Sequence, residues 1–286
     1  MITVFTPSYN RKNELKCLYE SLLEQDNCDF EWLIVDDGSS DGTDKFINIL
    51  KKQKKIKINY IYKENGGKQS AYNIGLSNAK GNIFLCIDSD DILSKNSLKL
   101  IAKDFDYIMA KKDVAGMMYV QGFINDNSKV IGSTFPQKNM LDTYFNIYHK
   151  HGVMGDKLIV LKTEVAREYY FPIIENEKFV PEALIFNRIS LKYKFKCSNK
   201  IMAYKEYLAD GYSNNYFNLV KKNPKGNMLY FKELYVLEKS IYNIYGYILF
   251  GIYGKIKFKD IIKGHSAKLM IILLYIPVWF ISKLRR

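Results

Sequence analysis

Cysteine and histidine are scarce in this sequence, and their spacing excludes the common redox and zinc motifs. The four cysteines form no C-x-x-C pair, and we interpret them as reduced thiols of a cytoplasmic protein. The three histidines are His149, His151 and His265. Because a zinc site needs more ligands at suitable spacing, we expect these side chains to face solvent.

Long apolar runs and glycine-rich nucleotide motifs are also missing. Ile241–Gly254 and Leu269–Ser282 are uncharged stretches of 14 residues each, whereas a membrane-spanning helix needs about 20. No signal peptide is expected, because Met1 leads directly into the apolar segment 2–5. Residues 64–70 contain Gly-Gly-Lys without the first glycine of a P-loop, and no G-x-G-x-x-G is present. Dinucleotide binding is therefore unsupported.

The sequence does have a large apolar content and an uneven positive charge. Of its 286 residues, 48% are hydrophobic and 15% aromatic, which is enough for one large domain or one domain with an appendage. The formal net charge is +13, and residues 221–286 carry +10 of it, with 13 Lys or Arg against three Asp or Glu. We expect this end to meet a phospholipid surface, a polyphosphate-linked acceptor or nucleic acid, the alternative being a solvated basic face.

Residues 1–110 alternate between strand and helix patterns. Strands are expected at 3–6, 32–35, 58–62 and 83–87, and helices at 11–24, 42–52, 68–78 and 95–110. This alternation predicts an α/β fold with a mostly parallel sheet and helices on both faces. Functional loops are then expected at the carboxyl ends of the strands.

The remaining chain has two different patterns. In residues 111–215, strands are expected at 117–124, 158–161 and 199–206, and helices at 140–149 and 179–193. Residues 216–286 are basic, aromatic and poor in turn signals. We therefore expect one domain at 1–215 and a helical extension at 216–286.

Carboxylates gather where the fourth predicted strand ends. The apolar segment 83–87 is followed by Asp88, Ser89, Asp90 and Asp91. Crowded carboxylates raise one another's pKa, so we infer that a divalent cation relieves their repulsion. Oxygen ligands suit Mg²⁺ or Mn²⁺. Such a cation needs an anionic partner, and a nucleoside diphosphate is the commonest.

Other predicted strand ends carry polar loops that face the same edge of the sheet. After the first strand, the turn 6–11 places Tyr9 where it can hold a nucleobase. Asp36 and Asp37 follow the second strand, and a carboxylate there can accept a hydrogen bond from the imino N–H of uracil. After the third strand, two glycines let the backbone approach a ligand, with Lys68 near phosphate.

In this order the motifs resemble those of the family 2 glycosyltransferases, which have the GT-A fold. The resemblance rests on residues 6–11 (TPSYNR), 35–43 (VDDGSSDGT), 65–75 (NGGKQSAYNIG) and 88–90 (DSD). It implies transfer of a sugar from a nucleoside-diphosphate donor, most often a UDP-sugar, to a hydroxyl of a glycan or lipid-linked oligosaccharide. It also implies a nucleotide-sugar-binding half at 1–110 and an acceptor-binding half at 111–215. Bacterial surface polysaccharides, such as capsules, fit this context.

The resemblance also implies roles for particular residues. The base pocket would be lined by Thr6, Pro7 and Tyr9, and Asp36 would bind uracil. The diphosphate or ribose would be flanked by Lys68 and Asn73. Asp88 and Ser89 would contact the ribose or sugar, and Asp90 would hold the Mn²⁺ or Mg²⁺ ion. Asp156, Lys157 and Arg188 are expected to shape the sugar or acceptor site, as is the loop 206–213.

The general base is expected on a helix in the acceptor half. In the family, a Glu-Asp pair often stands six residues ahead of an arginine, and here Glu182 stands six residues ahead of Arg188. Pro181 replaces the first acid of the pair. Glu182 is therefore the predicted base of a single displacement with inversion, with Glu177 and Glu175 as alternatives. The alternative is a purely structural role for Glu182, because the dipole of a helix favours a negative charge in its first turn.

The basic tail predicts a location at the inner face of the cell membrane. Ile241–Gly254 and Leu269–Ser282 are flanked by lysines and contain aromatic residues suited to the headgroup boundary. We expect helices that lie on the inner leaflet. Packing against the catalytic domain or against a second copy in a homo-oligomer is the alternative. Nucleic acid is disfavoured, because the charges interleave with aliphatic runs.

Two other functional classes share some of these features. A sugar nucleotidyltransferase also uses carboxylates and a metal on an α/β sheet, but no basic glycine-rich triphosphate loop follows the first strand. A non-catalytic nucleotide-sugar-binding subunit is the other alternative, and the complete set of acidic motifs argues against it.

Overall fold

The computed structural model describes residues 1–25, 28–205 and 216–284, and the chain forms two compact units. The first contains Met1–Tyr170 and Arg188–Glu206, and the second contains Phe171–Asn187 and Tyr207–Arg286. The boundary predicted between residues 215 and 216 thus leaves out a segment, since Phe171–Asn187 join the C-terminal helices rather than the sheet.

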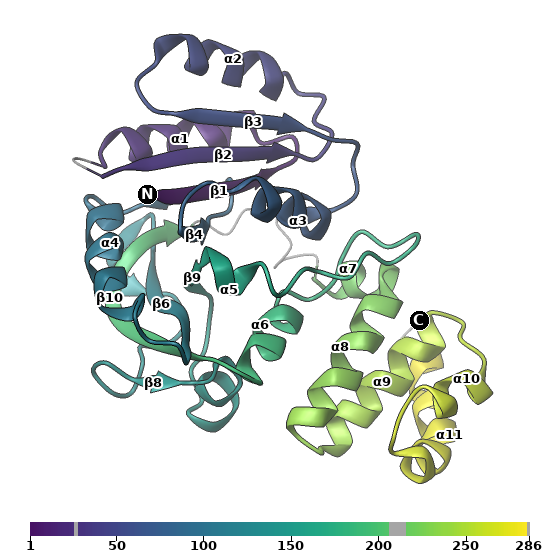
Figure 1. Cartoon of the computed structure of the whole chain (residues 1–286). Coiled ribbons are helices and arrows are strands. Elements are labelled where there is room, and N and C mark those ends of the chain that lie inside the picture. Colours follow the sequence, from purple (N-terminus) through teal and green to yellow (C-terminus); the bar gives the residue numbers. More distant parts are fainter. Residues whose placement is uncertain (26–27, 206–215, 285–286) are drawn as a thin grey trace. The chain divides into compact units, whose positions relative to one another are not determined.

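The first unit begins with a parallel sheet whose strands and helices alternate as the sequence predicts (Figure 1). Its strands are β1 (Ile2–Ser8), β2 (Phe30–Asp36), β3 (Ile58–Tyr62) and β4 (Ile83–Cys86), in the order β3-β2-β1-β4. All three pairings are parallel. Between them come α1 (Lys12–Leu23), α2 (Thr43–Gln53) and α3 (Lys68–Asn78). The four strand ends predicted to carry function therefore lie at one edge.

Side chains of this sheet are buried on both faces. Val4 belongs to a core cluster with Leu15 and Leu18 of α1, while Phe5, which points the other way, stacks on Phe84 and meets Tyr72 of α3 edge-on. Helices on both faces explain why every residue of β1 is buried and why its sequence does not alternate between apolar and polar.

The second half of the sheet is mixed rather than parallel. It adds β5 (Asp91–Leu93), β6 (Val114–Phe123), β7 (Asp126–Val130), β8 (Leu141–Asp142), β9 (Lys157–Lys162) and β10 (Lys194–Lys205), with helices α4 (Ser97–Ile108) and α5 (Thr163–Ala166). The main order continues β4-β9-β6-β10-β5. Strand β9 runs antiparallel to both β4 and β6. Its first residue therefore lies at the edge where β4 and β6 end.

Two helices predicted in this region are wrong or too long. Residues 140–149 form the short strand β8 and part of a π-helical turn, η1 (Asn146–Lys150), instead of an α-helix. The helix predicted at 179–193 is only α6 (Ala183–Ser190). It follows Pro181, which lacks a backbone N–H, and the chain enters β10 four residues after α6 ends.

Gly116 in β6 should tolerate no side chain. A Cβ there would lie 1.9 Å from the carbonyl oxygen of Val160 in β9, and the paired strands cannot separate without breaking their ladder. We expect Gly116→Ala to lower the free energy of unfolding by about 3 kcal/mol or more. Urea denaturation measures this change.

Gly152→Ala is the matched control, because that glycine has φ +63° but nothing within 4 Å of its Cβ position. Strain at positive φ alone should cost about 1 kcal/mol. Equal losses in the two variants would contradict the steric explanation.

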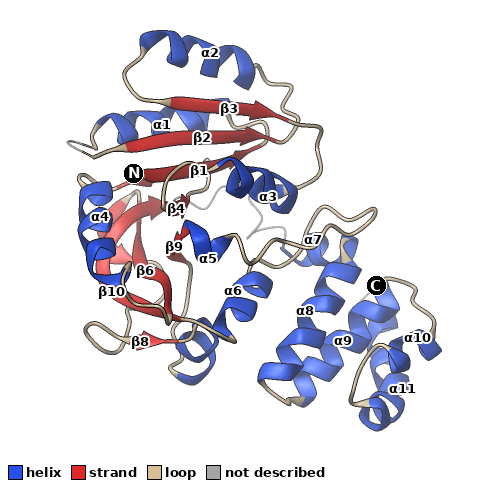
Figure 2. Cartoon of the chain, in the orientation of Figure 1, coloured by secondary structure: helices blue, strands red, loops and turns tan. Residues whose placement is uncertain are grey.

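The second unit is built from helices in its described residues (Figure 2). These are α7 (Tyr216–Lys222), α8 (Pro224–Leu237), α9 (Ile241–Tyr253), α10 (Phe258–Lys263) and α11 (Lys268–Leu284). Their core includes Ile244, Tyr247 and Ile248 of α9 together with Ile261 and Ile271. The expected helical extension is therefore present.

The position of α9 corrects one expectation. The run Ile241–Gly254 was expected to lie on a membrane surface, but nine residues of α9 are buried within the second unit. Its uncharged sequence reflects burial among helices of its own unit. In the described residues, no helix has both the length and the apolar character needed to cross a bilayer.

Candidate functional site

The carboxylate cluster lies in the turn that joins β4 to β5. The backbone of Ile87 still donates to the Phe5 carbonyl oxygen at 2.9 Å, which continues the sheet, and the chain then turns so that Asp91 N donates to Asp88 O at 3.2 Å. The parallel sheet thus places Asp88, Ser89 and Asp90 where β4 ends, as the sequence predicts. Ser89 is buried, and Asp88 and Asp90 are partly exposed.

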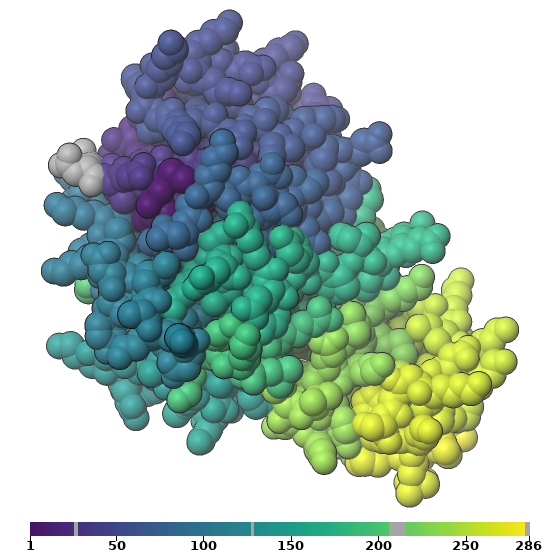
Figure 3. Space-filling view, viewed as in Figure 1, coloured from purple at the N-terminus to yellow at the C-terminus, as the bar shows by residue number. Residues whose placement is uncertain are grey.

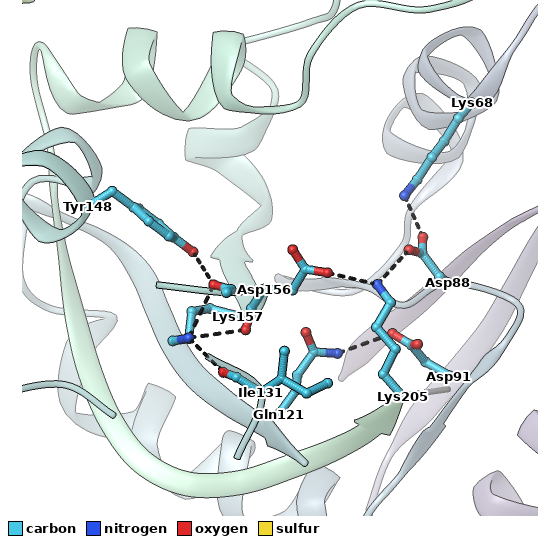
Figure 4. A network of polar contacts seen from close by, with 10 residues as sticks. Lys68, Asp88, Asp91, Gln121, Ile131, Tyr148, Asp156, Lys157 and Lys205 are labelled. Atoms are coloured by element: carbon cyan, nitrogen blue, oxygen red, sulfur yellow. Dashed lines mark hydrogen bonds and ion pairs between the residues drawn. The ribbon is translucent and has the colours of Figure 1, made fainter. Parts of the chain in front are cut away.

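Asp88 lies between two lysines, as Figure 4 shows. Lys68 Nζ, from the first turn of α3, is 2.5 Å from Asp88 Oδ1, and Lys205 Nζ, at the end of β10, is 3.6 Å from Oδ2. Burial by itself raises the pKa of Asp88, but the two ammonium groups outweigh it and lower the pKa to about 2. Asp88 is therefore an anion at neutral pH, held in place from both sides.

Lys205 joins this cluster to the loop that precedes β9. Its Nζ is 3.3 Å from Asp156 Oδ2. Burial tends to lower the pKa of Lys205, yet Asp91, Asp88 and Asp156 together raise it well above the ordinary range. A permanent positive charge thus stands among the carboxylates.

Lys157 stabilises the same loop through hydrogen bonds to backbone carbonyl oxygens (Figure 4). Its buried Nζ donates to the carbonyl oxygens of Ile131, Met154, Gly155 and Asp156 at 2.7–3.3 Å. Burial lowers the pKa of Lys157 to about 8. The amine of Lys157 is therefore directed at its own loop, and Asp156 is the member of this pair that reaches the site.

Asp91 and Asp90 differ from Asp88 in their surroundings. Asp91 Oδ2 accepts a hydrogen bond from Gln121 Nε2 at 3.1 Å, while Oδ1 is buried and has no hydrogen-bond partner in the described part of the chain. Burial raises the pKa of Asp91 to about 8, with Asp88 and Asp90 adding to it against the pull of Lys205. Burial and Asp88 also raise the pKa of Asp90. Both carboxyl groups therefore hold their protons more tightly than usual, because burial and the neighbouring carboxylates disfavour the charged forms.

This turn fits a divalent cation, although it is not a complete cage. Across the described residues, no three His, Cys, Asp or Glu side chains are arranged to hold a metal by themselves. Mg²⁺ at a nucleotide site takes one or two carboxylates, with water and phosphate oxygens completing the octahedron. Asp90, with Asp88 or the orphaned oxygen of Asp91 beside it, would supply that contribution.

The predicted base pocket is built on buried polar contacts. Thr6 Oγ1 accepts a hydrogen bond from Trp32 Nε1 at 3.0 Å, and Pro7 is buried beside it in β1. Tyr9 is 51% exposed. Asp36 is fully buried, and its two oxygens accept from the Tyr60 hydroxyl at 2.6 Å and from Ser39 N at 2.8 Å. These contacts hold Asp36 rigidly at the end of β2.

Asp37, which stands next to Asp36 at the end of β2, connects two of the loops. Its oxygens accept from Gly66 N at 2.9 Å and Gly67 N at 2.7 Å, and it also pairs with Lys63. The loop after β3 is thereby fixed against the loop after β2, and Lys68 starts α3 directly behind it. Asn73, partly exposed, lies further along α3.

The predicted catalytic glutamates belong to the second unit. Glu182 is exposed and immediately precedes α6. Glu177 accepts the backbone N–H groups of Lys225 and Gly226 at 2.7 and 2.8 Å, so it caps the N-terminus of α8. Glu175 is exposed.

Two further predictions concern the acceptor side. Arg188, partly buried, belongs to the first unit. The loop expected at 206–213 lies outside the described residues.

Two residues of the site escaped the sequence analysis. Lys205 and Tyr60 act through partners 117 and 24 positions away. For Lys205 a signal existed, because it ends a predicted strand, where functional residues gather.

The chain matches known glycosyltransferases in sequence. The model of the family described as Glycosyl transferase family 2 matches residues 3–170. An uncharacterised glycosyltransferase of Nostoc is 33% identical over 48% of this chain and 41% of its own length. The UDP-Glc:alpha-D-GlcNAc-diphosphoundecaprenol beta-1,3-glucosyltransferase WfgD of Escherichia coli is 29% identical over 63% of this chain and 67% of its own length. The chain spans less than half the length of the first two curated relatives that it matches, 17% of one and 41% of the other.

Solved structures support the same fold. The Staphylococcus aureus protein TarS (residues 1–349), crystallised with UDP-GlcNAc, superposes with a TM-score of 0.65 over 97% of this chain and 90% of its own, at 20% identity. This likeness confirms the predicted GT-A fold. The match to the family model covers more than half of the chain, and it includes the four motifs, the last of which lies in the carboxylate turn. The chain therefore belongs to glycosyl transferase family 2, and the prediction of a glycosyltransferase rather than a nucleotidyltransferase is confirmed.

Proposed function

We propose that this chain transfers a sugar from a UDP-sugar to a hydroxyl group of a glycan or lipid-linked oligosaccharide, with a divalent cation and with inversion at the anomeric carbon. The observation that carries the proposal is the carboxylate turn after β4, where Asp88, Asp90 and Asp91 meet the ammonium groups of Lys68 and Lys205. Opposite charges held in fixed positions at one sheet edge suit a metal-bound diphosphate better than they suit packing.

The donor would lie across the ends of β1, β2 and β4. Tyr9 offers an exposed ring to the base, and Asp36 an immobilised carboxylate to the uracil N–H. Asp88 and Ser89 would contact the ribose or sugar, with Asn73 and Lys68 toward the diphosphate. UDP-GlcNAc and UDP-Glc are the donors that appear in the descriptions of the structurally similar TarS and the related WfgD, which supports a uridine nucleotide here.

The cation, Mn²⁺ or Mg²⁺, would be held by Asp90. When bound, it supplies Lewis-acid stabilisation of the charge that develops on the leaving diphosphate. Lys68 and Lys205 add positive charge to the same region. Glu182 would accept the proton of the acceptor hydroxyl while that oxygen attacks the anomeric carbon. Attack from the face opposite the leaving group inverts the configuration.

The acceptor side would be shaped by Asp156 and Arg188. The related WfgD is described as acting on a diphosphoundecaprenol-linked sugar, and a relative from Bacillus subtilis as a putative teichuronic acid biosynthesis enzyme. These descriptions support a lipid-linked glycan in surface-polysaccharide synthesis, such as that of a capsule. Such an acceptor would place the enzyme at the inner face of the cell membrane.

A screen of nucleotide sugars tests the proposal. The purified chain is mixed with UDP-glucose, UDP-galactose, UDP-GlcNAc or GDP-mannose, with Mn²⁺ or with EDTA, and thermal stability and nucleotide release are recorded. We expect at least one UDP-sugar to stabilise the chain and to release UDP only with metal. Stabilisation by none of the four, or release that is indifferent to EDTA, would contradict it.

Lys205 provides a second test of the cation site. Because its ammonium stands among Asp88, Asp91 and Asp156, it should oppose a divalent cation that binds without nucleotide. We expect Lys205→Met to tighten Mn²⁺ binding severalfold in the absence of nucleotide, as measured by electron paramagnetic resonance titration. Lys200→Met, which removes an exposed lysine from the same strand, should leave the affinity unchanged. Equal affinities in all three proteins would place the cation elsewhere.

A further inference from the structure

Helix α11 is apolar around its whole circumference but is covered on one side only. Ile271 and Val278 are buried in the core of the second unit, and Ser282 continues the same stripe. The opposite stripe is exposed in the described structure. A helix that is apolar all round normally lies in a protein core or in a membrane. The uncovered side of α11 therefore needs an apolar environment from outside this unit.

The exposed stripe follows the helical repeat. Its members are Leu269, Ile272, Leu273, Ile276 and Phe280, flanked by Met270, Trp279 and Ile281. Leu273 and Ile276 are 67% and 65% exposed. Phe258 of α10 extends this surface, because it is exposed and its ring lies 4.3 Å from that of Tyr275 on α11. We call these side chains the α11 face; the helix is part of the yellow surface in Figure 3.

Exposed lysines stand at both ends of α11 and in the segment around α10. Lys268 begins the helix and Lys283 is near its end, where its Nζ lies over the Trp279 ring at 5.3 Å. Lys255, Lys257, Lys259 and Lys263 are exposed on α10 and the loops beside it. The only acidic residue from 239 to 286 is Asp260. The partner that covers this face must therefore be apolar in its interior and negative at its boundary.

We propose that the α11 face inserts into the headgroup region of a bilayer that contains anionic lipid, with the helix axis parallel to the membrane plane. Over its described residues, α11 lacks the length and apolar character needed to cross a bilayer. An in-plane helix needs only one apolar stripe and basic residues at headgroup level. The inference deepens the location given under the proposed function. It assigns the contact to α11 and excludes α9, which is buried.

A second copy of the chain is the competing occupant. A two-fold interface places the same surface against itself, so the lysines that border one face would meet those of the other. Like charges brought together in this way are unfavourable. Anionic lipid, by contrast, complements both the apolar stripe and its basic border.

Vesicle binding of the full chain tests the proposal. Cosedimentation is measured with vesicles of phosphatidylcholine alone and of phosphatidylcholine mixed with phosphatidylglycerol. We expect binding to the mixed vesicles, weakened by salt because part of the attraction is electrostatic. The variant Leu273→Glu with Ile276→Glu should bind at least about tenfold more weakly. Both positions are exposed, so the variant should keep its far-ultraviolet circular dichroism.

Tryptophan fluorescence gives a second readout. The chain has two tryptophans; Trp32 is fully buried and Trp279 is 39% exposed on α11. Mixed vesicles should shift the emission of Trp279 to shorter wavelength. Lipids brominated near the headgroup should quench it more than lipids brominated near the chain ends, as an in-plane helix requires. Stronger quenching by the lipids brominated near the chain ends would contradict an orientation of α11 parallel to the membrane plane.

Controls separate this surface from exposed apolar residues in general. Ile49→Glu with Leu191→Glu changes two residues of the first unit that are 58% and 66% exposed, and this variant should bind vesicles like the unmodified chain. Equal loss in both variants, or no vesicle binding together with a dimer in analytical ultracentrifugation, would overturn the proposal. UDP release from the donor in solution should be unchanged by the α11 variant, so failure of the membrane inference leaves the proposed chemistry to be judged separately.

Discussion

Replacement of Asp90 by alanine is expected to lower glycosyl transfer on the order of a thousandfold or more, because the leaving diphosphate loses the metal-bound side of its site. The variant should remain folded. Burial and the charge of Asp88 raise the pKa of Asp90, so removing this carboxylate relieves repulsion in the turn. Turnover with a UDP-sugar and Mn²⁺ measures the loss.

Metal binding in the presence of UDP is the second readout for Asp90→Ala. We expect the Mn²⁺ signal of the ternary complex to disappear while the thermal midpoint without ligand stays within a few degrees. Asp106→Ala, which removes an exposed carboxylate from α4, is the matched control and should behave like the unmodified chain. Full activity in Asp90→Ala would end the assignment of the metal to this turn.

Glu182→Gln is expected to have the second large effect. If Glu182 takes the acceptor proton, its amide analogue should reduce kcat by a factor of about 10² to 10⁴. The donor KM should change little, because donor binding does not require the base. Initial rates at varied donor and acceptor concentrations separate the two parameters.

The neighbouring residues Glu175 and Glu177 provide control variants for Glu182→Gln. Glu177 caps α8 through two backbone N–H groups, so Glu177→Gln should lower stability by about 1 kcal/mol and change kcat only slightly. Glu175→Gln, at an exposed position, should change neither. A large fall of kcat in Glu175→Gln or Glu177→Gln, with normal turnover in Glu182→Gln, would move the base to that residue.

The parallel half of the fold was predictable because its signals are local. Apolar strands such as Ile83–Cys86 end in polar turns, and amphipathic helices such as α1 follow at short intervals. The carboxylate turn was found for the same reason, since Asp88, Ser89, Asp90 and Asp91 are adjacent in the sequence. Where neighbours in the chain are neighbours in the site, the pattern of residues is sufficient.

The remaining features depend on contacts between distant residues. Lys205 reaches Asp88 only because β10 ends beside β4's turn, and Asp36 is immobilised by Tyr60 from the next strand. Likewise, the uncharged sequences of α9 and α11 look alike. Nothing local distinguishes the helix surrounded by its own unit from the helix with one exposed side. Tertiary packing decides these questions, and a single sequence does not display it.

The reversed direction of β9 has an effect on how this enzyme can diversify. Because β9 begins at the edge where β4 and β6 end, the segment 133–153, whose strand β8 pairs with β10, returns to the sheet beside the carboxylate turn. Lys157 holds the chain there through its four carbonyl contacts. Under the proposed function, exchanges in the loops on either side of β8 would alter the acceptor side and leave the strands β1 to β4 unchanged. Swapping the segment 133–153 between relatives, with Asp156 and Lys157 retained, is thus a rational route to new acceptor preferences.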